Sequence, residues 1–247
     1  MQDLLTRGID ENGNIRREET HRFKDSPLGR IPEEWDVVRL GEVVEIILST
    51  VDKKIKPTER KVLLCNYLDV YKNEYLRRSL DFKVGTATSR EISKFIILKG
   101  DVIITKDSEE FDDIAKPSYV SEEIHNLICG YHLAILRPQK NINGLFLSKI
   151  LKFRPVNIFF QKRANGITRF GITKETIERA LVIFPSLLEQ QRIVFILSQI
   201  DQTIEKEQQY KEKLERLKQG LMQDLLTGKV RVNHLIEGDT ENVSQAR

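Results

Sequence analysis

The chain has 247 residues, of which 40% are hydrophobic and 31% are charged, and its formal net charge at pH 7 is +3. This length and apolar fraction allow a sizeable core in one large or two modest domains. No apolar run reaches the roughly 18 residues of a membrane span, and the start lacks the shape of a signal peptide. We therefore expect a soluble, cytoplasmic protein with no membrane partner, in which Cys65 and Cys129 are reduced core residues.

The chain opens with a sequence that it repeats near its end. The hexapeptide MQDLLT occupies residues 1–6 and returns unchanged at residues 222–227. An identical repeat of this length indicates a duplicated architecture, in which the chain begins where the helix of a preceding unit would end. The residues that follow are polar and rich in turn formers. We therefore interpret residues 1–21 as a remnant and linker, with a domain boundary near residue 22.

A mixed α/β (α+β) domain is predicted over residues 22–186, because short apolar runs alternate irregularly with helical segments. Pro32 fixes its first turn, and Trp35 is expected in the core. Strands are expected at residues 43–48, 62–68, 102–105, 119–120, 127–136 and 181–184. Helices are expected at residues 89–98, with Thr88 as the N-cap, and at residues 145–153 and 156–163, which Pro155 separates.

The basic charge of the chain belongs to this domain. Residues 22–186 carry 28 Lys and Arg against 22 Asp and Glu, a net charge of +6. Within them, residues 124–174 contain nine basic residues and no acidic residue. Such an asymmetry indicates a polyanion as the partner.

The candidate contact for that polyanion is the segment of residues 161–171. It combines cationic donors for phosphates with amide and hydroxyl side chains that can read base edges, on a loop flexed by glycine. A second basic patch lies at residues 52–61, and a lysine opens the acidic segment of residues 106–113. We predict that DNA is contacted by Lys53, Lys54, Lys106, Lys162, Arg163, Asn165, Gly166, Thr168 and Arg169. For each of these residues, an ordinary solvated loop position is the alternative.

The last predicted element is one continuous helix over residues 187–227, about 60 Å long at 1.5 Å per residue. Its apolar residues step by three and four, as in the seam of a coiled coil, and Glu207 and Lys211 interrupt that seam. We predict that a partner helix docks on Ile193, Leu197, Ile200, Ile204, Leu214, Leu217, Leu221 and Leu225. A solvated helix that packs only on its own domain is the alternative. Residues 228–247 lose the periodicity and are expected to form a C-terminal tail.

Catalytic and metal-binding patterns are weak. His125, Cys129 and His132 could be metal ligands, but residues 129 and 132 of one strand would point to opposite faces, and no fourth ligand is evident. Asp101, with Lys106 or with residues 59–61, could belong to a nuclease, but two-metal hydrolysis needs several carboxylates at one place. The sequence contains no glycine-rich phosphate loop. We therefore expect no catalytic residue, metal or cofactor in this chain.

Four segments resemble the specificity subunit of type I restriction-modification enzymes. They are residues 28–43 (LGRIPEEWDVVRLGEV), 100–106 (GDVIITK), 184–193 (FPSLLEQQRI) and 217–230 (LKQGLMQDLLTGKV). The resemblance implies a non-catalytic DNA reader with two target recognition domains joined by two long antiparallel helices. It also implies double-stranded DNA, methyltransferase subunits and restriction (translocase) subunits as partners. S-adenosylmethionine, ATP and Mg²⁺ would then be bound by those subunits.

This chain departs from the family pattern, because it holds one recognition domain and one long helix. It would be either a half subunit that pairs with itself or with another half subunit, or the second half of a longer protein. In each case we expect it to read one half of a bipartite target. Two other functions stay open: a self-contained nuclease or methyltransferase, and a coiled-coil adaptor without a DNA role.

Overall fold

The computed structural model describes residues 2–52 and 54–230, which divide into two compact units at Phe195 and Ile196. Lys53 and residues 231–247, which make up most of the predicted tail, lie outside the described residues. None of the described helices is long and apolar enough to cross a membrane.

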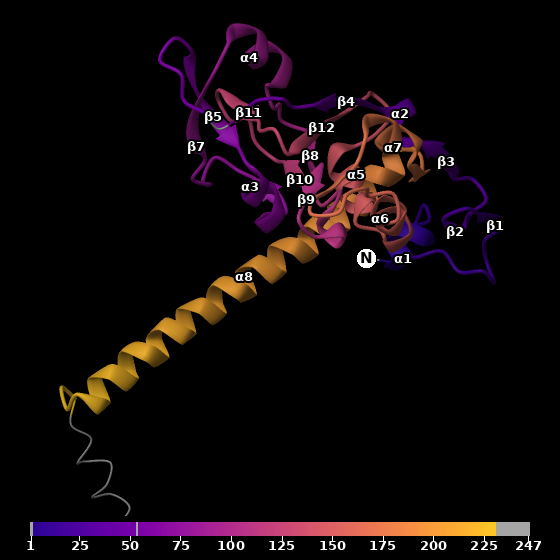
Figure 1. The fold of residues 1–247 in the computed structure, drawn as a ribbon. Coiled ribbons are helices and arrows are strands. Elements are labelled where there is room, and N and C mark those ends of the chain that lie inside the picture. Colours follow the sequence, from indigo (N-terminus) through magenta and orange to yellow (C-terminus); the bar gives the residue numbers. More distant parts are fainter. Residues whose placement is uncertain (1, 53, 231–247) are drawn as a thin grey trace, which may run out of the picture. The chain divides into compact units, whose positions relative to one another are not determined.

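The first unit is built around a five-stranded sheet with the order β4-β12-β8-β10-β6 (Figure 1). Its neighbours pair antiparallel, except for the parallel pair β10 and β6. All four side chains of β8 are buried, as is typical of a central strand that is covered on both faces. The strands are β4 (Val44–Leu48), β6 (Tyr75–Leu76), β8 (Val102–Thr105), β10 (Pro117–Val120) and β12 (Leu133–Pro138).

A second, three-stranded sheet has the order β11-β5-β7 and shares one hydrophobic cluster with the first sheet. It consists of β5 (Arg60–Cys65), β7 (Lys83–Ala87) and β11 (Leu127–Cys129). The single strand predicted over residues 127–136 is therefore wrong, because β11 and β12 belong to different sheets. They part at Gly130, whose N–H donates to the Cys65 carbonyl at 2.9 Å. A Cβ at Gly130 would lie 2.7 Å from that oxygen, so only glycine permits this approach.

Three two-stranded pairs complete the first unit. They are β1 (Phe23–Ser26) with β2 (Gly29–Pro32), β3 (Asp36–Arg39) with β14 (Leu181–Phe184), and β9 (Asp107–Ser108) with β13 (Phe170–Gly171). The helices of this unit are α1 (Gln2–Thr6), α2 (Leu40–Val43), α3 (Tyr67–Lys72), α4 (Ser89–Phe95), α5 (Gly144–Leu151), α6 (Arg154–Gln161), α7 (Lys174–Arg179) and the 3₁₀ turn Phe111–Asp113.

Local signals explain several helix boundaries. Thr88 caps α4 as predicted: its hydroxyl accepts from the backbone N–H of Glu91 at 3.2 Å. The predicted break at Pro155 falls earlier, because Pro155 lies in the first turn of α6, where its missing N–H costs nothing. The strand predicted to reach residue 68 ends at Cys65, because Asn66 is the N-cap of α3.

The N-terminal stretch predicted as a linker is part of the first unit. Leu4, Leu5 and Ile9 are buried, and α1 contacts β2. Gly8 has a φ of +64°, and a Cβ there would lie 2.3 Å from side-chain atoms of Trp35 and Glu189. Composition alone suggested a linker, because the partners that bury this stretch are far away in the sequence.

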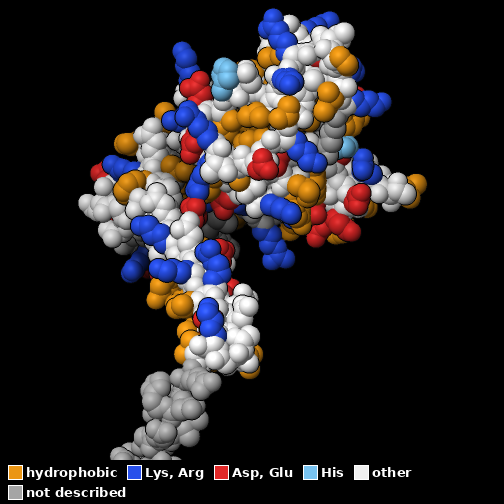
Figure 2. All heavy atoms as spheres, turned by 90° about the vertical axis from the view of Figure 1, so that its left-hand side faces the viewer, with side chains coloured by type: hydrophobic (Ala, Val, Ile, Leu, Met, Phe, Trp, Pro, Cys, Tyr) orange, Lys and Arg blue, Asp and Glu red, His pale blue; other side chains and the backbone are white. Residues whose placement is uncertain are grey.

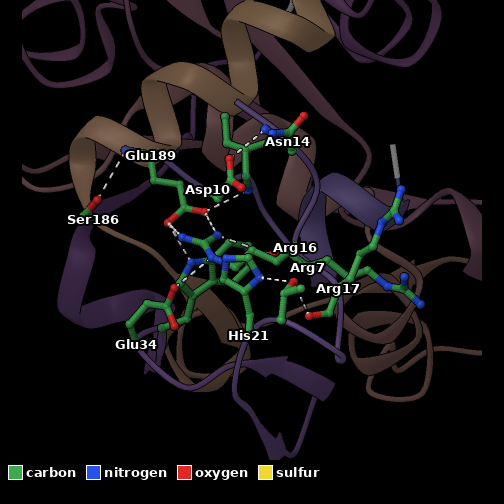
Figure 3. A network of polar contacts seen from close by, with 12 residues as sticks. Arg7, Asp10, Asn14, Arg16, Arg17, His21, Glu34, Ser186 and Glu189 are labelled. Atoms are coloured by element: carbon green, nitrogen blue, oxygen red, sulfur yellow. Dashed lines mark hydrogen bonds and ion pairs between the residues drawn. The ribbon is translucent and has the colours of Figure 1, made fainter. Parts of the chain in front are cut away.

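The N-terminal stretch is held at the carboxylate of Glu189, which lies in the first turn of α8 (Leu187–Leu226), as Figure 3 shows. Arg16 pairs with both carboxylate oxygens, and its Nη2 lies 3.2 Å from Oε2. The indole N–H of Trp35 donates to Oε2 at 2.9 Å, and the N–H of Ile9 donates to Oε1 at 3.1 Å. The residue beside Glu189, Gln190, is also buried and accepts from the N–H of Asn143 at 2.8 Å. These bonds fix the first turn of α8 in the first unit.

Candidate nucleic-acid interface

The predicted DNA-contacting loop, residues 162–169, is closed at its base by β9 and β13. Phe170 pairs with Ser108 and Gly171 pairs with Asp107, while Asn165 and Gly171 exchange backbone hydrogen bonds of 3.0 Å. At Gly166 the φ is +146°, and a Cβ would lie 1.8 Å from the carbonyl oxygen of Arg169. Gly166 thus sets the shape of the loop, whereas the sequence suggested only that it makes the loop flexible.

The polar side chains of this loop point to solvent. Lys162, Arg163, Asn165, Thr168 and Arg169 are all exposed. The guanidinium of Arg163 lies 3.8 Å from the centre of the Phe159 ring, which orients it without neutralising its charge. Among the described residues, neither Lys162 nor Arg163 has a carboxylate partner. Arg169 has only a loose one, 3.8 Å away on the exposed Glu109. The loop therefore presents cations that an anion can still pair with.

Arg169, at the end of this loop, and Lys54, from the other basic patch, line two adjoining hollows. One hollow is lined by Asp107 and Arg169, and an adjoining one by Lys54 and Tyr131. Both hollows are lined by Asn66, Tyr67 and His132. We call the surface of these two hollows the hollow face. The fold thus brings together Lys54 and Arg169, which are far apart in the sequence.

Lys106 lies at this face but is already engaged. Its ammonium group is 2.5 Å from Asp107 and 4.9 Å from the centre of the Tyr131 ring. The side chain is half-buried, and His132 Nδ1 lies 3.3 Å from the same carboxylate of Asp107. Lys106 was predicted as a phosphate contact. In the structure it pairs with Asp107, and it would have to break this ion pair before it could bind a phosphate.

Aromatic side chains on the hollow face were missed by the sequence analysis. Tyr67 and Tyr71 stack with ring centres 5.5 Å apart, and Lys116 lies 4.0 Å from the centre of the Tyr71 ring. Partial burial raises the pKa of Tyr67, so its hydroxyl stays protonated beside Ser108, 3.0 Å away. The i, i+4 spacing of the tyrosines would have shown the pair, had residues 66–68 not been assigned to a strand.

The hollow face also holds carboxylates. Its lining includes Asp69, Asp81, Glu109, Glu110 and Asp113. Figure 2 shows Lys and Arg side chains interspersed with acidic and hydrophobic side chains over the first unit. Carboxylates repel phosphates, but they can accept a hydrogen bond from the amino group of cytosine. The lining of the hollow face is therefore mainly carboxylate and aromatic, which suits contacts to bases, and its cations are Lys54, Lys83 and Arg169.

Residues 124–174, which contain no acidic residue and which we call the acid-free window, include basic side chains that pair with carboxylates inside the fold. Arg137 donates to both oxygens of Asp101, at 3.0 and 2.9 Å, and Lys149 is buried against Glu74. Lys152 lies 2.9 Å from the same Glu74 carboxylate. These acids lie outside residues 124–174. The sequence analysis therefore overestimated the positive charge that the acid-free window leaves available to a polyanion. Lys162, Arg163 and Arg169 remain exposed.

The structure explains the residues that the sequence analysis weighed as catalytic or metal-binding: Asp101 and Cys129 are buried. Asp101 is buried, and Oδ2 also accepts from the N–H of Leu98 at 2.9 Å. Burial raises the pKa of both cysteine thiols, Cys65 and Cys129, which keeps them protonated. Within residues 2–52 and 54–230, no group of three His, Cys, Asp or Glu side chains is placed to hold a metal ion.

Only part of the predicted docking seam on α8 is accessible to a partner helix. Ile193 and Leu197 are 0% and 4% exposed in the single chain, so neither is free for a partner helix. Six positions stay exposed by 45–62%: Ile200, Ile204, Leu214, Leu217, Leu221 and Leu225. Figure 2 shows hydrophobic side chains exposed along this part of α8.

A family comparison decides what kind of chain this is. The model of the type I restriction modification DNA specificity domain matches residues 32–216. The chain belongs to this family. The matched residues include the whole hollow face and most of α8.

Two curated specificity subunits from Methanocaldococcus jannaschii are similar to this specificity-domain chain. The putative type I restriction enzyme MjaX specificity subunit is 28% identical over 214 residues, which cover 83% of this chain and 48% of the relative. The type I restriction enzyme MjaVIII specificity subunit is 25% identical, and the match covers 95% and 53%. The chain thus spans about half the length of the curated relatives it matches.

Solved structures share the fold of this specificity-domain chain. A chain of a type I R-M system complex superposes with a TM-score of 0.55 at 21% identity, covering 78% of this chain and 46% of that one. The HsdS subunit from Thermoanaerobacter tengcongensis superposes with a TM-score of 0.51, also at 21% identity, covering 82% and 47%.

Proposed function

We propose that this chain is the non-catalytic DNA-reading subunit of a type I restriction-modification complex, and that its hollow face reads one half of a bipartite target. The observation that carries the proposal is that Lys54 and Arg169 line one hollowed surface, while the loop that ends at Arg169 also exposes Lys162 and Arg163. Tyrosines, amides and carboxylates that can contact bases lie between them. Phosphate contacts from the cations would place the protein, and the polar groups would select the sequence.

The second part of the proposal concerns α8. Six exposed apolar residues at coiled-coil spacing on one helix favour a partner helix, because pairing would remove them from water. We propose that α8 pairs antiparallel with the α8 of a second copy or of another half subunit, and that methyltransferase and restriction subunits dock on this pair. Those subunits would bind S-adenosylmethionine, ATP and Mg²⁺. Two-fold pairing would give a target of two inverted half-sites.

The salt dependence of DNA binding tests the first part. Each phosphate contact contributes about 0.9 to the slope of log affinity against log salt. We expect Lys162→Ala to reduce that slope by about one contact and to weaken cognate and random DNA alike. Asn165→Ala is expected to weaken cognate DNA by about 1–3 kcal/mol and random DNA little.

Lys140→Ala is the matched control for Lys162→Ala, because Lys140 is also an exposed lysine but lies outside the loop of residues 162–169 and does not line the hollow face. A wild-type affinity that is flat with salt, or equal effects of Lys140→Ala and Lys162→Ala, would remove the loop from the DNA interface.

A further inference from the structure

The loop of residues 162–169 carries the most exposed large hydrophobic side chain of the described residues. Ile167 is 97% exposed, whereas the next two, Leu226 and Ile55, are 83% and 70% exposed. Single apolar side chains are ordinary on a protein surface, where part of their area usually packs on a neighbour. Ile167 has almost no such packing, so the stability of the fold does not explain an isoleucine at this position.

The loop holds Ile167 out in solvent because it is closed on both sides. Asn165 and Gly171 exchange backbone hydrogen bonds of 3.0 Å, and Nδ2 of Asn165 donates to the carbonyl oxygen of Arg163 at 3.1 Å. Behind the loop, the Phe170 ring meets the Phe111 ring edge to face, with the centres 6.1 Å apart. A loop tethered in this way keeps Ile167 from folding back onto the apolar surface of the domain.

The neighbours of Ile167 suit a nucleic acid better than an apolar protein surface. Residues 161–171 contain three cations, Lys162, Arg163 and Arg169, and no acidic residue. An apolar contact made among phosphate-binding cations has to find an apolar group on the nucleic acid itself. In the major groove of DNA, the C5-methyl group of thymine is the apolar group that the base edges present.

We propose that Ile167 packs on the C5-methyl group of a thymine in the half-site and makes the loop selective for an A·T pair at that position. The inference rests on the proposed DNA reading by this loop. Cytosine, the other pyrimidine, has no methyl group at C5, so the contact distinguishes the two. Isoleucine suits this task because its branched Cβ leaves few side-chain rotamers to lose on contact.

Deoxyuridine, which pairs as thymine does but lacks the methyl group, tests the contact. Each thymine of the half-site found by methylation mapping is replaced in turn in a synthetic duplex, and binding by the full-length chain with its methyltransferase subunits is measured. At one position we expect the wild-type affinity to fall about fourfold, the effect of losing one buried methyl group.

The Ile167→Ala variant should remove that sensitivity. We expect it to bind the thymine duplex at least threefold more weakly than wild type and to bind the thymine and deoxyuridine duplexes equally. Its slope of log affinity against log salt should match that of wild type, because no charge is removed. Ile15→Ala is the matched control, since Ile15 is 43% exposed and does not line the hollow face. It should keep the fourfold effect of deoxyuridine.

Three results would overturn the contact: a half-site without an A·T pair, a wild-type protein that no deoxyuridine affects, or an equal deoxyuridine effect in wild type and Ile167→Ala. Ile167→Ala that weakens only the assembly with methyltransferase subunits would likewise overturn it, by assigning Ile167 to a protein contact. In each case the salt slope of Lys162→Ala still judges DNA reading by the loop, so the two failures are distinguishable.

Discussion

At the scale of single residues, Glu189 has the largest structural role that the sequence did not show. In the sequence, Glu189 was noted only as part of the segment of residues 184–193, which leads into the long helix. In the structure, its buried carboxylate joins the N-terminal segment, Trp35 and the first turn of α8. Two buried charges lose their hydration, so the pair itself adds little to stability. Removing Glu189 is costly, because the buried Arg16 then keeps only the exposed Glu34 as a counter-charge, and the N–H groups of Trp35 and Ile9 lose their acceptor.

We therefore expect Glu189→Ala to lower the free energy of unfolding of the first unit by about 3–5 kcal/mol. Urea unfolding followed by the fluorescence of Trp35, the single tryptophan, measures this directly. Glu178→Ala is the control, because the Glu178 side chain is 46% exposed and its partner Lys174 is 3.7 Å away. An exposed pair of this kind contributes about 0–1 kcal/mol. Equal losses for the two variants would mean that Glu189 does not hold the unit together.

Residue-level prediction succeeded where the signal was local. The exposed cations of residues 162–169 followed from composition, and Thr88 followed from a capping pattern. It failed where the partner is distant in sequence: Asp107 engages Lys106, and Glu74 engages Lys149. A count of acidic residues along the sequence cannot detect such carboxylates, because they approach the lysines only in the folded structure.

At the scale of elements, the sequence predicted the long helix best. The helix was expected over residues 187–227 and is observed at Leu187–Leu226, because its periodicity repeats over many turns. Strands at residues 102–105 and 181–184 also matched. Sheet membership could not be predicted in the same way. The separation of β11 from β12 depends on the approach of Gly130 to Cys65, which no local pattern records.

If two α8 helices pair antiparallel, their length sets the distance between the half-sites. Inserting four helix-forming residues after Lys211 lengthens α8 by about 6 Å. The half-sites should then move apart by about one to two base pairs, at roughly 3.4 Å each, with their sequences unchanged. Methylation mapping of the variant measures the spacer. The same insertion after Gly228, beyond the end of α8, should leave the spacer as it is. An unchanged spacer in an active Lys211 variant would mean that α8 does not set the distance.

At the scale of the whole molecule, one hollow face and one long helix amount to about half of the curated relatives. We propose that pairing rebuilds a two-domain reader from such a chain, which the exposed apolar residues of α8 favour. In the two-fold pair that we propose, each unit would meet an identical half-site in inverted orientation.

The central claim, that this chain supplies the sequence reading of the complex, is tested most directly by mapping methylated bases in cells that express it with its methyltransferase partner. We expect methylation at a motif of two short inverted blocks separated by an unread spacer, and loss of that motif when the chain is absent. The Asn165→Ala variant should relax one block and, by symmetry, its inverted copy. Methylation that keeps the same motif without the chain, or a motif that the Asn165→Ala variant leaves intact, would contradict the account.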